Sequence, residues 1–110
     1  MDEDHALFWV LAESWLRRPG VTRSTMMGFP CLRVDGEFVA CCDRRSGGLV
    51  VKLDEARVTA LVADGLAEPF APAGRRFRAW AEIPVEAADR WPAMLDEAVT
   101  AAGDRARSGR

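Results

Sequence analysis

The stretch from Pro19 to Leu53 constrains the fold more than any other part of the sequence. Short apolar runs alternate here with two turn signals, Asp35-Gly36 and Ser46-Gly47-Gly48. An Asp-Gly pair between alternating apolar positions is among the strongest hairpin signals in a sequence. We therefore expect an antiparallel meander whose strands cover residues 22–26, 29–34, 37–43 and 49–53.

Helical patterns flank this meander. Apolar residues recur at helical spacing in three segments, and Asp54 and Gly65 supply the cap and the stop of the middle one. A further alternating segment follows a loop that contains two prolines. The expected helices cover residues 4–18, 54–63 and 89–102, and the expected fifth strand covers 76–83. The chain is thus predicted to be an α+β domain: a single antiparallel β-meander sheet of about five strands, flanked by an N-terminal helix, a middle helix and a C-terminal helix.

The length and the ends of the chain bound its organisation. The 110 residues match one domain, so we expect a single domain over 1–110. The segment 103–110 is polar and is expected to form a frayed tail. No apolar run reaches the roughly 18 residues of a membrane span, and the first residues are acidic where a secretory signal is basic. We expect a cytoplasmic protein without a membrane segment.

The faces of the central hairpin follow from its turn. With a two-residue turn at Asp35-Gly36, Leu32 lies opposite Val39 and Cys31 lies opposite Ala40. Both faces of the hairpin are then largely apolar, which a sheet with one wet side does not show. Either helices cover both faces or one face meets a partner chain. A symmetric homodimer through a hairpin face is the commonest arrangement of the second kind.

Cysteine supplies the sharpest candidates for chemistry. Three are present, and a reducing cytosol would keep them as thiols. Adjacent Cys41 and Cys42 point to opposite faces of a strand, and the predicted register makes Cys31 and Cys42 diagonal neighbours at about 7 Å. The only histidine is His5, so we expect no tetrahedral zinc site and no cofactor. Buried structural thiols are the leading interpretation; the alternative is a reactive thiol, or a small-molecule or soft-metal site, formed by Cys31, Cys42 and Met27.

Arginines are the best candidates for binding a macromolecule. Alternation on the fifth strand puts Arg76, Arg78 and Trp80 on one face, and an arginine beside an aromatic ring suits phosphate contact and base stacking. The structural alternative is that Trp80 packs under the last helix while the arginines pair with Glu82, Glu86 or Asp89 at the surface. The net charge of −2 argues against a surface that tracks nucleic acid throughout. The candidate residues for nucleic-acid or partner binding are Arg44, Arg45, Arg75, Arg76, Arg78 and Trp80.

The order of elements and motifs resembles the N-terminal domain of the TfoX/Sxy family, which is close in fold to the MmcQ/YjbR-like proteins. The resemblance covers about residues 7–102, and its most specific pieces are residues 23–28, Asp35-Gly36-Glu37-Phe38, 49–54 and Glu68-Pro69-Phe70. It implies a small domain built on an antiparallel sheet flanked by helices, and a role in regulation such as that of competence genes. We therefore expect a non-enzymatic regulatory or interaction module, with a protein or nucleic-acid partner.

Overall fold

In the part of the chain that the structure describes, six strands form one antiparallel sheet in the order β1-β2-β3-β4-β6-β5. The computed structural model describes residues 3–26, 29–43, 45–71 and 74–108. The strands are β1 (Val21–Met26), β2 (Phe29–Val34), β3 (Glu37–Cys42), β4 (Leu49–Lys52), β5 (Glu68–Phe70) and β6 (Phe77–Ile83). The predicted α+β class and meander are confirmed, with one strand more than expected. The extra strand is β5, which lies at the edge of the sheet, where Pro69 can lack an N–H donor without breaking an inner ladder.

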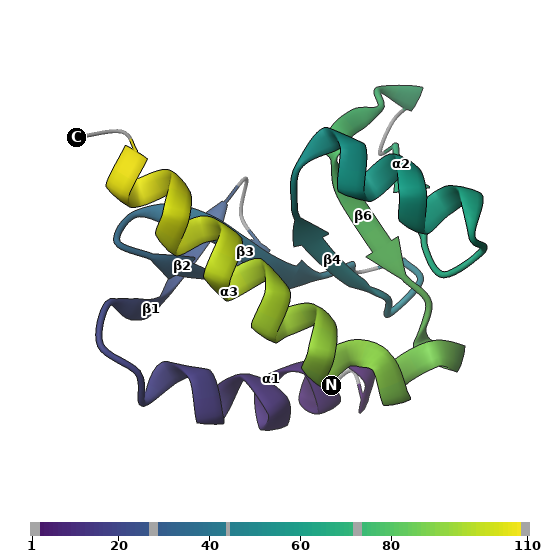
Figure 1. Cartoon of the computed structure of the whole chain (residues 1–110). Helices are drawn as coiled ribbons and strands as arrows, with labels where there is room; N and C mark the ends of the chain where they lie inside the picture. The colour runs from purple at the N-terminus through teal and green to yellow at the C-terminus, as the bar shows by residue number, and fades with distance from the viewer. Residues whose placement is uncertain (1–2, 27–28, 44, 72–73, 109–110) are drawn as a thin grey trace.

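The three α-helices of the described ranges lie against one side of this sheet (Figure 1). They are α1 (Glu3–Leu16), α2 (Glu55–Ala63) and α3 (Trp91–Ser108), and the 3-10 segment η2 (Val85–Arg90) leads into α3. The chain kinks within η2 at Ala87, whose dihedral angles are not helical (φ −107°, ψ 30°). Helix α3 begins at Trp91, which puts Pro92 in its first turn, where a missing N–H costs nothing.

The helix side and the opposite side of the sheet are covered differently. Phe8 of α1, Leu61 of α2 and Leu95 of α3 belong to one buried cluster with sheet residues such as Leu32 and Val51. The opposite side, here called the helix-free face, has a second cluster that contains only strand residues among those described. Its members are Cys31, Phe38, Cys41 and Val50, with Phe70 and Trp80 packed against them. The second apolar face is therefore shielded largely by its own aromatic rings.

A β-bulge changes the register of the central hairpin. Asp35 (φ 48°) and Gly36 (φ 87°) form the expected tight turn, and Arg33 lies opposite Phe38 as expected. The register then shifts, so that Leu32 lies opposite Ala40 rather than Val39. The predicted register beyond the turn is therefore wrong, because a turn fixes only the pairs beside it. Val39 and Ala40 both pack into the helix-side cluster.

The same shift rearranges the cysteines. Cys31 lies directly opposite Cys41, and both belong to the cluster on the helix-free face. Cys42 belongs to the helix-side cluster. The predicted diagonal pair of Cys31 and Cys42 is therefore wrong, although Cys41 and Cys42 do point to opposite faces as expected.

The C-terminal segment is more ordered than its composition indicates. Helix α3 continues through Ser108, so the expectation that the chain frays from residue 103 is wrong for residues 103–108. Gly103 is buried, and Arg105 reaches back to the sheet, where its Nη2 donates to the Phe38 carbonyl at 2.9 Å. The Nε of Arg105 also donates to Oε1 of Glu37 at 3.3 Å.

We expect Arg105→Ala to loosen the last turns of α3, because it removes both bonds to β3. The free energy of opening these turns should fall by about 0.5 to 1.5 kcal/mol, a typical contribution of a hydrogen bond. Hydrogen exchange of the backbone amides in residues 103–108 measures this free energy. Arg107→Ala is the control, since the partner of Arg107 among the described residues is Asp104 on its own helix. Equal exchange in the two variants would contradict the anchoring role of Arg105.

Candidate functional site

Stacked aromatic rings occupy one end of the helix-free face. Trp80 of β6 lies parallel to Phe38 of β3, with ring centroids 4.5 Å apart and 5° between the planes. Phe77 and Phe70 approach Trp80 at 5.0 Å and 5.5 Å. A register shift between Pro69 and Phe70 brings Phe70 opposite Phe77, so neighbouring strands supply the two rings. We call Phe70, Phe77 and Trp80 the aromatic patch.

The aromatic patch is accessible and bordered by positive charge. All three of its side chains are half-buried, whereas Phe38 beneath them is buried. The guanidinium carbon of Arg75 lies 5.6 Å from the centroid of Phe77, within cation–π range. A planar ligand could therefore stack on an exposed ring with a cation beside it.

The structure separates the other candidate arginines from this patch. Arg76 and Arg78 line an open hollow of about 280 Å³ together with Glu55 and Thr59 of α2. The Nη1 of Arg78 lies 3.8 Å from Oε1 of Glu55. These two arginines are thus oriented toward α2, and the predicted single face with Trp80 is not formed.

The remaining binding candidates lie in or near turns. Arg45 is exposed in the β3–β4 turn, and its backbone N–H donates to Oδ1 of Asp43 at 2.8 Å. Arg44 and Met27 lie outside the described residues. Of the described arginines that were predicted to bind, Arg75 is therefore the one placed against an aromatic ring.

The cysteines are all reduced and buried. Burial raises the pKa of Cys31, although the charge and hydrogen bonding of Arg33 oppose this effect. Burial and neighbouring acidic groups raise the pKa of Cys41 to about 12. Cys42 packs on the helix side of the sheet, opposite to Cys31 and Cys41. Its thiol lies 3.5 Å from the Gly47 carbonyl oxygen. The pairing of Cys31 with Cys42 that a joint thiol site needs is therefore not formed, and the described residues contain no cluster of three or more potential metal ligands.

Glu82 is a buried carboxyl group, so the expectation that it lies at the surface as a partner of the arginines is wrong. Its side chain accepts a hydrogen bond from the Ser46 hydroxyl, whose oxygen in turn accepts one from the Gly48 N–H at 3.0 Å. Burial, and then the hydrogen bond and charge of Asp43 and the charge of Glu68, raise the pKa of Glu82 to about 7. The bond from Ser46 lowers this pKa. Alternation along β6 was the available signal, because it places Glu82 on the same side as Trp80.

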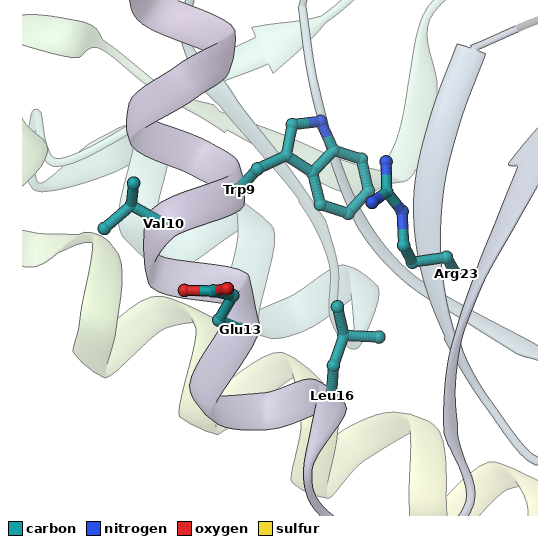
Figure 2. A pocket seen from close by; sticks show the side chains of 5 residues that line it. All are labelled: Trp9, Val10, Glu13, Leu16 and Arg23. Carbon is teal, nitrogen blue, oxygen red and sulfur yellow. The ribbon is translucent and has the colours of Figure 1, made fainter.

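A second hollow, of about 340 Å³, lies between α1 and β1. Figure 2 shows the indole of Trp9 facing the guanidinium group of Arg23, whose central carbon is 4.0 Å from the ring centroid. Val10, Glu13 and Leu16 complete the lining. The sequence analysis did not single out these residues, since Trp9 belongs to a helix and Arg23 to a strand. Neither Glu82 nor a cysteine lines either hollow.

Comparison with models of known protein families, with curated proteins and with solved structures finds no match. The description of the fold therefore rests on the structure alone. Within the described part of the chain, no helix is long and apolar enough to cross a membrane.

Proposed function

We propose that this protein is a non-enzymatic interaction module that binds single-stranded nucleic acid through its aromatic patch. The observation that carries the proposal is the contact of Trp80 with both Phe70 and Phe77. Trp80 and Phe70 pack on the helix-free face, and Arg75 lies beside Phe77 at the border of the patch. Bases stack on aromatic rings whatever their sequence, and an adjacent arginine can contact a phosphate. The resemblance to the TfoX/Sxy N-terminal domain adds a regulatory role to this proposal. A cytoplasmic location is also proposed, because the three cysteines are thiols, as in a reducing compartment.

The geometry favours single strands over a duplex. The rings lie across the surface of a sheet, so a base reaches them only after it has left its own stack. The net charge of −2 and the acidic side chains of Glu68 and Glu82 near the patch limit the number of phosphates that can be held. We therefore expect a short site with weak affinity and little preference for sequence.

Binding is tested with a fluorescent oligothymidylate and a duplex of equal length, by fluorescence anisotropy at 50 and 200 mM salt. We expect the single strand to bind more tightly. The logarithm of its association constant should fall linearly with the logarithm of the salt concentration, with a slope of about −0.7 for each phosphate contacted. No binding of either probe at 50 mM salt would refute the proposal.

Trp80→Ala should weaken this binding roughly 5- to 150-fold, because one stacked base is worth about 1 to 3 kcal/mol. Trp80→Phe keeps a ring and should lose much less. Arg75→Ala should also weaken binding, and Arg107→Ala is its matched control, since Arg107 is exposed on α3. Circular dichroism of each variant confirms that it is folded. Equal affinities of the Trp80→Ala and wild-type proteins would place the binding elsewhere.

The half-buried aromatic patch also supports a second candidate, a symmetric homodimer through the helix-free face. Two copies would cover each other's rings. Light scattering at high micromolar concentration tests this, and a monomeric mass would exclude it. The thiol-based alternative is not proposed, since Cys31 and Cys42 lie on opposite sides of the sheet.

A further inference from the structure

Cys31 and Cys41 face each other across β2 and β3. They are direct partners in the antiparallel register, and opposite residues project to the same side of a sheet. Direct partners have Cα atoms roughly 4.5 or 5.5 Å apart, depending on the kind of pair. Both distances lie within the roughly 4.4–6.8 Å that a disulfide bridges. The two thiols also belong to the same buried cluster.

We propose that Cys31 and Cys41 are a site of reversible disulfide formation that joins β2 to β3. The oxidant is a small-molecule disulfide such as oxidised glutathione. One protein thiolate attacks it, forming a mixed disulfide and releasing one small thiol. The second protein thiolate then attacks the protein sulfur of that mixed disulfide and releases the other small thiol. Two protein thiols are oxidised by two electrons, one small-molecule disulfide is reduced to two thiols, and the two protons pass to those products.

The surroundings of the two thiols assign the order of attack. Arg33 lies on the same side of β2 as Cys31, two residues along the strand, and favours the thiolate form of Cys31. Burial, and then the charges of neighbouring acidic groups, raise the pKa of Cys41 to about 12, and no cation is among the groups that shift it. Cys31 is therefore the attacking thiol and Cys41 the resolving one.

The two thiols are shielded from solvent. Cys31 is fully buried and Cys41 is 5% exposed, in a cluster that contains Phe38 and against which Trp80 packs. Oxidation must therefore await a local opening of this cluster, and it should be slow in the closed protein. Once formed, the bond would hold β2 and β3 in the bulged register.

The third cysteine provides an internal control. Cys42 follows Cys41 in sequence but belongs to the helix-side cluster, so it cannot meet Cys31 without a change of register. Native geometry thus allows one particular pair among three cysteines, whereas an unfolded chain would allow several. This selectivity makes the proposal testable without any knowledge of a ligand.

The test treats the native chain of 110 residues with defined ratios of oxidised to reduced glutathione, alkylates the remaining thiols and maps peptides by mass spectrometry. We expect loss of two hydrogens, a Cys31–Cys41 linkage and an alkylated Cys42, all reversed by dithiothreitol. Cys42→Ala should give the same linkage, and Cys31→Ala and Cys41→Ala should give none. Mapping of the wild-type protein decides the matter even if a variant does not fold. A Cys41–Cys42 linkage, or three alkylated thiols at every ratio, would overturn the proposal. The assay contains no nucleic acid, so its result is independent of the proposed binding function.

Discussion

Replacing Trp91 with alanine is expected to lower the free energy of unfolding by about 3 to 5 kcal/mol, the usual cost of truncating a buried tryptophan. Trp91 is the largest fully buried side chain among the described residues, and it begins α3. Its loss leaves a cavity where that helix joins the helix-side core. Because a domain of this kind is stable by only about 5 to 15 kcal/mol, this one change removes a large part of the total.

Urea unfolding followed by circular dichroism measures this loss. Trp91→Phe keeps a large ring and removes an indole N–H that has no hydrogen-bond partner among the described residues. It should therefore cost less than the alanine variant. Val10→Ala is the surface control, since Val10 is 65% exposed, and should change stability by no more than about 0.5 kcal/mol. If Trp91→Ala cost as little as Val10→Ala, the described core would be wrong.

Glu82→Gln is expected to make the protein more stable at pH 8 and to flatten its dependence on pH. The pKa of Glu82 is about 7 in the folded protein against an ordinary value of 4.5, chiefly because the carboxyl group is buried. Between these two values the folded state holds a proton that the unfolded chain has lost. The stability of the wild-type protein therefore falls as the pH rises through this window, by up to about 3 kcal/mol in total.

Urea unfolding of the two proteins between pH 4.5 and 8.5 measures the effect. Glutamine is always neutral and can still accept the hydrogen bond from Ser46. The two proteins should thus have similar stability at the acid end and diverge as the pH rises. Glu86→Gln is the matched control, because Glu86 is exposed on η2, and it should leave the slope unchanged. Parallel curves for Glu82→Gln and the wild-type protein would contradict the assigned cause.

Only part of the candidate site could be predicted from the sequence. The sequence identified Trp80 and Arg75 as binding candidates, and the structure places Arg75 against Phe77, a neighbour of Trp80. It did not identify Phe70, which reaches the patch through a register shift between β5 and β6. Nor did it identify Glu82 as a buried group, since its burial depends on a turn from another part of the chain. Such contacts join residues that are far apart in sequence, and no local pattern encodes them.

The sequence by itself determined the local elements, because alternation, helical spacing and turn residues act over a few positions. It predicted the tight turn at Asp35-Gly36, the helices and the α+β class. Only the tertiary structure decided that the register shifts at Val39, that Cys31 therefore meets Cys41, and that α3 continues through Ser108. The physical reason is that a bulge or a helix end is chosen by what it buries. Val39 and Ala40 both pack into the helix-side core, and Arg105 binds β3, through contacts that form only once the chain has folded.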